Sequence, residues 1–154
     1  MLSKEETEKI ETLLEHYPTR RAACLDALKV VQQNRGWVSD ESIADLGRIL
    51  GMTPGELDNI ATFYNLIFRK PVGRHVILLC DSVSCYIMKY GDILEVLKGQ
   101  LGIAFGETTD DRRFTLLPVP CLGACDQAPV MMVDEDLHTG LTAGKIPGIL
   151  ENYK

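Results

Sequence analysis

The chain has 154 residues, of which 45% are hydrophobic, and a formal net charge of −6, so it is long enough for one domain or for a domain with a small appendage. The acidic balance argues against a nucleic-acid partner. No apolar run is long enough to cross a bilayer, and we expect no direct membrane insertion. The first residues resemble neither a signal peptide nor a transit peptide. Free cysteines without a secretory signal predict a cytoplasmic location, with any attachment to the membrane made through partners.

Residues 1–70 are predicted to form a small N-terminal helical bundle. Apolar residues recur at helical spacing in four stretches, the second of them over residues 20–33. The first, third and fourth stretches begin with residues that favour helix N-termini: Ser3 with Glu6, Ser39 or Asp40, and Thr53 with Pro54 and Glu56. Four short helices joined by brief loops make a bundle.

From residue 71 onward the pattern changes to alternating strands and helices. Apolar runs at 76–79 and 114–117 predict buried strands, and residues 87–101 between them predict a helix. Segments 130–133 and 137–141 flank an acidic turn and predict a hairpin, and 146–153 predicts a closing helix. The order β-α-β-β-β-α is typical of a small α/β domain of the thioredoxin-like type. We therefore expect two domains, 1–70 and 71–154.

Four of the five cysteines form two close pairs in the second of these domains. Cys80 and Cys85 are separated by four residues, and Cys121 and Cys125 by three. Each pair follows a predicted strand, and the carboxyl ends of neighbouring parallel strands meet at one edge of a sheet. Four thiolates are the ligand set of a soft-metal centre. The four cysteines are therefore the candidate metal and cofactor ligands.

Three interpretations of the two pairs compete. Structural zinc sites usually contain cysteines separated by two residues, and neither pair has that spacing. A disulfide framework is typical of secreted, cysteine-dense chains. A 2Fe–2S cluster has two irons that each need two thiolates, which two separate pairs can supply. The spacing therefore favours an iron–sulfur cluster over zinc, and both over disulfides. The fifth cysteine, Cys24, lies on the apolar face of a predicted helix and is expected to pack there.

Several segments resemble one protein family over nearly the whole chain: 61–64 (Ala-Thr-Phe-Tyr), 71–76 (Pro-Val-Gly-Arg-His-Val), 80–82 (Cys-Asp-Ser), and 111–129, where Asp111, Phe114 and Thr115 precede Cys-Leu-Gly-Ala-Cys-Asp-Gln-Ala-Pro. This family is the small iron–sulfur subunit of the NADH-oxidising arm of respiratory NADH:quinone oxidoreductase (complex I), which is the E subunit in bacteria. Related subunits occur in NAD-linked hydrogenases and formate dehydrogenases. The resemblance therefore indicates the module more firmly than the parent complex.

The resemblance implies a thioredoxin-like 2Fe–2S ferredoxin domain preceded by a helical bundle. It implies one 2Fe–2S cluster on the four paired cysteines, and docking on a partner subunit that binds flavin and NADH. We accordingly expect an electron-transfer subunit, peripheral to the inner membrane, that exchanges single electrons with the partner's flavin. The alternatives are the equivalent subunit of a hydrogenase or formate dehydrogenase, a zinc-stabilised scaffold without redox activity, and a free-standing ferredoxin.

FMN and NADH are expected on the partner and not on this chain. No Gly-rich dinucleotide fingerprint follows any predicted strand. Residues 140–146 resemble a phosphate loop but are one residue short and lack the terminal hydroxyl that binds magnesium. No catalytic residues are therefore assigned, and the isolated chain is predicted not to oxidise NADH.

Overall fold

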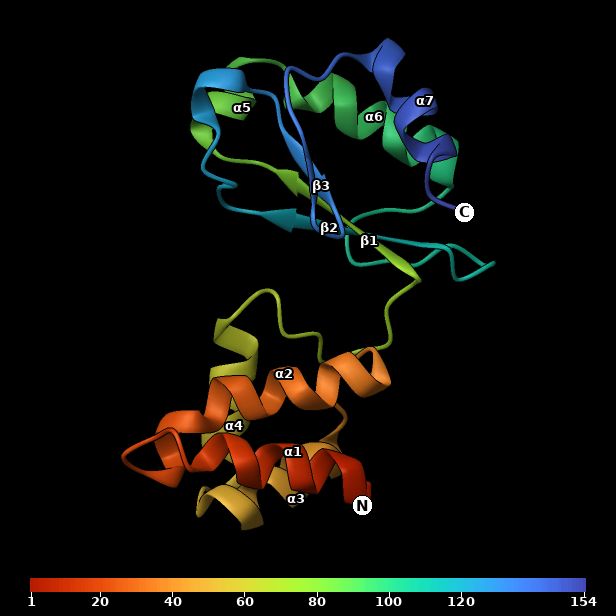
Figure 1. Ribbon diagram of the computed structural model, residues 1–154. Helices are drawn as coiled ribbons and strands as arrows, with labels where there is room; N and C mark the ends of the chain where they lie inside the picture. The colour runs from red at the N-terminus through yellow and green to blue at the C-terminus, as the bar shows by residue number, and fades with distance from the viewer. The chain divides into compact units, whose positions relative to one another are not determined.

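The computed structural model describes residues 1–154, which divide into two units, Met1–Pro71 and Val72–Lys154 (Figure 1). Each unit has a hydrophobic core of its own, formed by residues between 10 and 67 in the first and between 77 and 150 in the second. No helix combines the length and the apolar character needed to cross a membrane.

The first unit contains four α-helices: α1 (Lys4–Leu14), α2 (Cys24–Arg35), α3 (Asp40–Leu50) and α4 (Pro54–Phe63) (Figure 1). Ser3 and Thr53 each complete a capping box, and Ser39 caps α3 through the Ser42 N–H. The second helix differs from the prediction, because a 3₁₀ turn over Arg20–Ala23 precedes it and it continues to Arg35. Thr19 caps that turn through the Ala22 N–H, so the helical segment begins at a local start signal.

One buried ion pair joins the first two helices of this unit. The Glu6 side chain on α1 is 2% exposed, and the Arg35 guanidinium donates to both of its oxygens, at 2.7 and 2.6 Å. The Ser3 N–H also donates to this carboxylate, at 2.6 Å. The Arg35 hydrogen bonds, assisted by those from Ser3, lower the pKa of Glu6 from 4.5 to about 2.

We predict that Glu6→Gln removes a pH-dependent part of the free energy of unfolding. A carboxyl whose folded pKa is depressed stabilises the fold above its unfolded pKa, and this stability is lost as the pH falls from 4.5 towards 2. The shift corresponds to about 3 kcal/mol. Urea unfolding followed by circular dichroism should show a difference between parent and variant at pH 6 that shrinks towards pH 2. The matched control is Glu5→Gln, because the Glu5 side chain is 73% exposed. An equal loss in both variants would contradict the role given to the buried pair.

The second unit contains a four-stranded mixed sheet in the order β2-β1-β3-β4. Strand β1 (His75–Cys80) is parallel to β2 (Phe114–Val119) and antiparallel to β3 (Met131–Val133), which forms a hairpin with β4 (Asp136–His138). Three α-helices accompany the sheet: α5 (Val83–Ile87), α6 (Tyr90–Leu101) and α7 (Ile146–Glu151). Short 3₁₀ turns occupy Cys125–Gln127 and Ala143–Lys145. The predicted α/β class is confirmed.

Apolar side chains of α6 and α7 share one core with the sheet. Ile93 and Leu97 from α6 and Ile146 from α7 pack with Ile77 and Leu79 of β1, and Figure 1 shows these two helices side by side. This packing buries Ile77 and Leu79, which alternate with the rest of β1 and so face the same side of the sheet.

Three predicted elements differ from the structure. The helix predicted over 87–101 is α6 and begins later, at Tyr90, because Lys89 before it adopts a left-handed conformation with φ of +66°; the separate helix α5, which ends at Ile87, was not predicted. The strand predicted to end before Pro118 continues through it, which is possible because β2 is an edge strand and needs no donor on its outer side. The strand predicted over 137–141 is the shorter β4.

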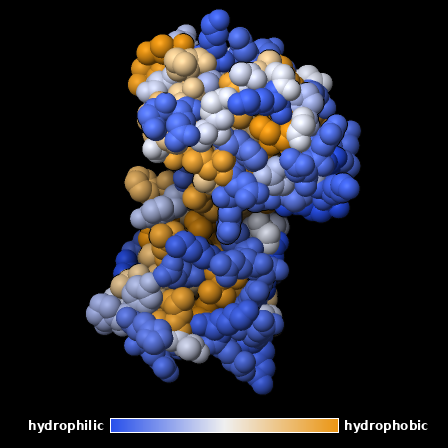
Figure 2. All heavy atoms as spheres, turned by 45° about the horizontal axis from the view of Figure 1, so that its top comes forward, coloured by the Kyte–Doolittle hydropathy of each residue, from blue (hydrophilic) through white to orange (hydrophobic).

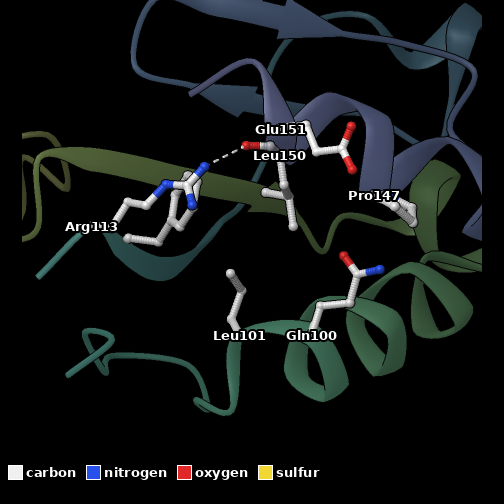
Figure 3. A pocket seen from close by; sticks show the side chains of 7 residues that line it. Gln100, Leu101, Arg113, Pro147, Leu150 and Glu151 are labelled. Carbon is white, nitrogen blue, oxygen red and sulfur yellow. Dashed lines mark hydrogen bonds between the residues drawn. The ribbon is translucent and has the colours of Figure 1, made fainter. Parts of the chain in front are cut away.

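The C-terminal segment is fastened to the start of β2 by Arg113. Its guanidinium donates to the carbonyl oxygens of Tyr153, at 2.7 Å, and Leu150, at 3.1 Å. Figure 3 shows the Leu150 contact at the wall of a pocket of about 350 Å³, lined by Gln100, Leu101, Arg113, Phe114, Pro147, Leu150 and Glu151. The Arg113 side chain therefore holds the last turn of α7 next to the start of β2.

Candidate metal centre

The two cysteine pairs lie at the carboxyl ends of the two parallel strands. Cys80 is the last residue of β1 and pairs in register with Val119, the last residue of β2. Cys121 follows two residues later, and Cys85 lies on α5, directly after β1. The parallel pairing of β1 with β2 therefore places both cysteine loops at one edge of the sheet, as predicted.

Cys80 and Cys85 form the buried pair. The Cys80 thiol lies 3.8 Å from the Pro120 carbonyl oxygen. Burial, and secondarily the neighbouring Cys80, raise the pKa of the Cys85 thiol to about 11, while a hydrogen bond from the Val130 backbone acts in the opposite direction. Without a metal the Cys85 thiol therefore favours its protonated form, and a nearby cation would favour its thiolate.

Cys121 and Cys125 form the exposed pair, with their Sγ atoms 3.6 Å apart. The Gly123 N–H donates to Cys121 Sγ at 3.3 Å and lowers the pKa of that thiol. The adjacent Cys121 raises the pKa of Cys125. Gly123 can make this contact because its φ of +82° lies in the left-handed region, which residues with a Cβ rarely adopt. The turn at Gly123 therefore both brings the two sulfurs together and supplies a donor to one of them.

Interactions between the pairs bring the four thiols into one cluster. The Cys80 side chain is close enough to affect the pKa of Cys85, Cys121 and Cys125. The Ser84 side chain on α5 acts in the opposite direction to Cys121 and lowers the pKa of Cys125. The structure thus brings together all four of the cysteines that the sequence singled out.

The donor set fits a two-iron centre. A 2Fe–2S cluster needs two thiolates on each of two irons. Two thiolates on one tetrahedral metal, with metal–sulfur bonds of about 2.3 Å, lie about 3.8 Å apart, close to the 3.6 Å between Cys121 and Cys125. Four thiols in two pairs therefore suit iron–sulfur chemistry.

Cys24 and His75 lie away from the four thiols. Cys24 packs against the core of the helical unit. His75 is at the opposite end of β1 from Cys80, where its Nδ1 contacts Asp134 Oδ2 at 2.7 Å. A six-residue strand is about 17 Å long, so His75 is remote from the thiols.

Sequence reasoning missed two features of the site. The first is the backbone of Val130, which donates to Cys85 and carries no sequence signal. The second is α5, whose outward face is apolar: Tyr86 is 69% and Ile87 is 71% exposed, and Val83 and Met88 are also exposed. Ser82 before this segment could have indicated a helix start. Figure 2 shows the apolar surface over the position that α5 has in Figure 1.

Comparison with known proteins agrees with this geometry. The profile of the thioredoxin-like [2Fe-2S] ferredoxin family matches residues 10–154. The chain is 52% identical over 153 residues to the E subunit of the NADH-quinone oxidoreductase of Escherichia coli K12, covering 99% of this chain and 92% of that protein. It is 47% identical, with the same coverage, to the corresponding subunit of the NADH-quinone oxidoreductase of Pseudomonas aeruginosa.

Among solved structures, an NAD⁺-reducing [NiFe]-hydrogenase in the air-oxidised state superposes with a TM-score of 0.73 at 27% identity. The match covers 87% of this chain and 23% of the hydrogenase chain. This chain therefore corresponds to a small part of that larger protein.

A mixed sheet with two thiol pairs at the ends of its parallel strands defines a thioredoxin-like iron–sulfur protein. The chain belongs to the thioredoxin-like [2Fe-2S] ferredoxin family, and its full-length relatives are the E subunits of NADH-quinone oxidoreductases. Its cofactor is accordingly a single 2Fe–2S cluster.

Proposed function

We propose that this chain is the electron-transfer subunit of a respiratory NADH:quinone oxidoreductase. The observation that carries the proposal is the 52% identity, over 99% of the chain, to a subunit of such an oxidoreductase. The convergence of the two thiol pairs at one edge of the sheet supports it from the structure. The chain has no nucleotide fingerprint of its own, so its oxidoreductase role depends on the other subunits of the complex.

The proposed ligands are Cys80, Cys85, Cys121 and Cys125. When bound, a 2Fe–2S cluster supplies one-electron oxidation and reduction. The chain gives the two sides of the cluster different surroundings, because Cys80 and Cys85 are buried while Cys121 and Cys125 are exposed to solvent. The N–H groups of Gly123 and Val130 point at sulfurs and stabilise negative charge there, which is how hydrogen bonds tune such centres.

The proposed partner is a subunit that binds flavin and NADH. Two exposed apolar surfaces support docking. One is the outward face of α5, on the same short helix as Cys85. The other lies at the end of α4, where Phe63 is 80% exposed beside Tyr64 and Leu66. Exposed apolar groups of this kind mark interaction sites in proteins that assemble. Attachment to the inner membrane, on its cytoplasmic side, is proposed to occur through such partner subunits.

We also propose that the two structural units divide the work. The helical unit, residues 1–70, acts mainly in docking, and residues 71–154 hold the cluster. All four candidate ligands lie in the second unit, which has a hydrophobic core of its own.

A second candidate is the equivalent subunit of an NAD-linked hydrogenase. The TM-score of 0.73 to an NAD⁺-reducing hydrogenase favours this possibility. Sequence identity favours the first candidate, because it is 27% to the hydrogenase and 52% to the quinone-linked subunit.

The purified chain can be tested by its absorbance spectrum and its iron content. A red-brown protein with two irons per chain is expected, because a 2Fe–2S cluster contains two irons. A colourless protein containing zinc would instead indicate a non-redox scaffold. Co-purification from the native organism then identifies the parent complex, with a flavoprotein alongside quinone-reducing subunits as the expected result. A hydrogenase large subunit in their place would favour the second candidate.

We predict that the isolated chain neither binds nor oxidises NADH. Its only Gly-rich segment near a Lys, residues 140–146, is part of the link between β4 and α7 and includes a 3₁₀ turn. Isothermal titration of the chain with NADH should show no heat of binding beyond dilution, while the complex with its flavoprotein should bind NADH. Micromolar affinity of the chain alone would refute this prediction.

A further inference from the structure

The short distance that suits Cys121 and Cys125 to a shared metal also leaves their sulfurs in contact in the cluster-free chain. The two Sγ atoms are 3.6 Å apart, and a disulfide bond is about 2.05 Å long. The sulfurs therefore need to approach each other by only about 1.5 Å. Both residues are exposed, so a dissolved reagent can reach them.

The loop that carries this pair has room to adjust. Gly123 lies between the two cysteines, and no other residue approaches within 4 Å of the place where its Cβ would be. Cys125 begins a 3₁₀ turn of three residues, which is short enough to shift with the loop. A small approach of the sulfurs therefore does not require the sheet to move.

The other cysteines are protected by the fold. Cys80 and Cys85 are both buried, Cys80 in the central strand and Cys85 on the inner face of α5. Cys24 lies on the first unit, away from any other cysteine in sequence, and packs against the helical core. Access and proximity together thus single out Cys121 and Cys125.

We propose that Cys121 and Cys125 form a reversible intramolecular disulfide in the cluster-free chain, by exchange with a small disulfide such as oxidised glutathione. The thiolate of one cysteine attacks a glutathione sulfur, which forms a mixed disulfide and releases one glutathione thiolate. The second cysteine then attacks the protein-bound sulfur and releases the second glutathione. Two protein thiols are oxidised and one oxidised glutathione is reduced to two thiols.

The consequence concerns assembly of the metal centre. The disulfide removes two of the four thiolates, so an oxidised chain cannot accept the cluster until a thiol reductant restores them. This consequence rests on the proposed ligand role of the cysteines, whereas formation of the disulfide does not.

The experiment uses the full-length, cluster-free chain, reduced and then incubated with oxidised glutathione under nitrogen. Remaining thiols are alkylated, and the protein is digested with trypsin. The cysteines fall in three separate peptides, 22–29, 75–89 and 114–145, because no Lys or Arg interrupts them. Peptide 114–145 is expected to lose both thiols and two hydrogens, while 75–89 and 22–29 remain alkylated. Oxidation of 75–89 at the same rate, or two glutathiones on 114–145, would overturn the proposal.

Two controls sharpen the result. In Cys125→Ser, the mixed disulfide cannot resolve, and one glutathione should persist on peptide 114–145. In the parent chain unfolded in urea, the preference for this peptide over 75–89 should disappear, because burial no longer protects Cys80 and Cys85. Persistence of the preference in urea would show that the fold does not cause it.

Iron uptake separates this proposal from the proposed function. The oxidised chain should take up no iron and sulfide until dithiothreitol is added, and then as much as the reduced chain. If the disulfide forms but uptake is unaffected, the assigned ligands are wrong while the thiol chemistry stands. If the reduced chain takes up iron and no disulfide forms, the ligand role stands and the redox proposal fails.

Discussion

Serine in place of Cys80, Cys85, Cys121 or Cys125 is expected to impair or abolish cluster binding, while Cys24→Ser leaves it unchanged. A serine hydroxyl is a harder ligand than a thiolate and does not ionise near neutral pH, so it binds iron of a sulfur cluster poorly. Cys24 belongs to the helical core and has no place in the ligand set. Iron and acid-labile sulfide per chain, together with visible absorbance, measure the outcome.

The four variants should differ in their effect on the fold. Cys85→Ser introduces a hydroxyl at a buried position, and an unsatisfied buried hydroxyl costs about 1–3 kcal/mol of unfolding free energy. Cys125→Ser places its hydroxyl at an exposed position and should leave the cluster-free chain about as stable as the parent. Thermal unfolding of the cluster-free proteins tests this difference. The ligand assignment would be overturned by a Cys24 variant that loses iron alongside a Cys125 variant that keeps it.

A chain that starts at Pro71 is expected to keep the cluster spectrum and to lose most of its affinity for the flavoprotein partner. The sheet, the helices that cover it and all four candidate ligands lie beyond that point. The deleted segment contains the exposed apolar residues Phe63, Tyr64 and Leu66. A pull-down with the flavoprotein, with absorbance measured on the same sample, gives both readouts.

A full-length variant keeps this prediction testable if the shortened chain does not fold. Phe63→Ser combined with Leu66→Ser alters only exposed side chains, so the fold and the cluster should persist while partner binding weakens. The control is Leu137→Ser, which also replaces an exposed apolar side chain but lies on β4 of the second unit. Partner binding as tight as in the parent, for both the shortened chain and the double variant, would show that the helical unit is not a docking element.

The helix starts of the first unit were predictable because they depend on neighbours in sequence. The capping boxes at Ser3 and Thr53 need only residues three positions apart, and both are present in the structure. The candidate ligands were likewise visible as two cysteine pairs after two apolar runs. That they meet required only that β1 and β2 be adjacent and parallel, as the crossover pattern indicated.

The break between α5 and α6 could not be predicted, because the left-handed conformation at that point is carried by Lys89, a residue type that rarely adopts it. The continuation of β2 through Pro118 depended on that strand lying at the sheet edge, which is a property of strand order and not of local sequence. The exposed face of α5 could not be predicted either, because apolar residue types such as those of Tyr86 and Ile87 usually indicate burial.

The type of donor and the pairing of donors could be predicted, because both depend on residue identity and spacing along the chain. The burial of Cys80 and Cys85 and the exposure of Cys121 and Cys125 follow only from the folded structure. The fold also directs the backbone N–H groups of Gly123 and Val130 at the sulfurs of Cys121 and Cys85. Burial and backbone direction arise from contacts between segments distant in sequence, and every residue carries the same N–H group, so no pattern of side chains along the chain encodes them.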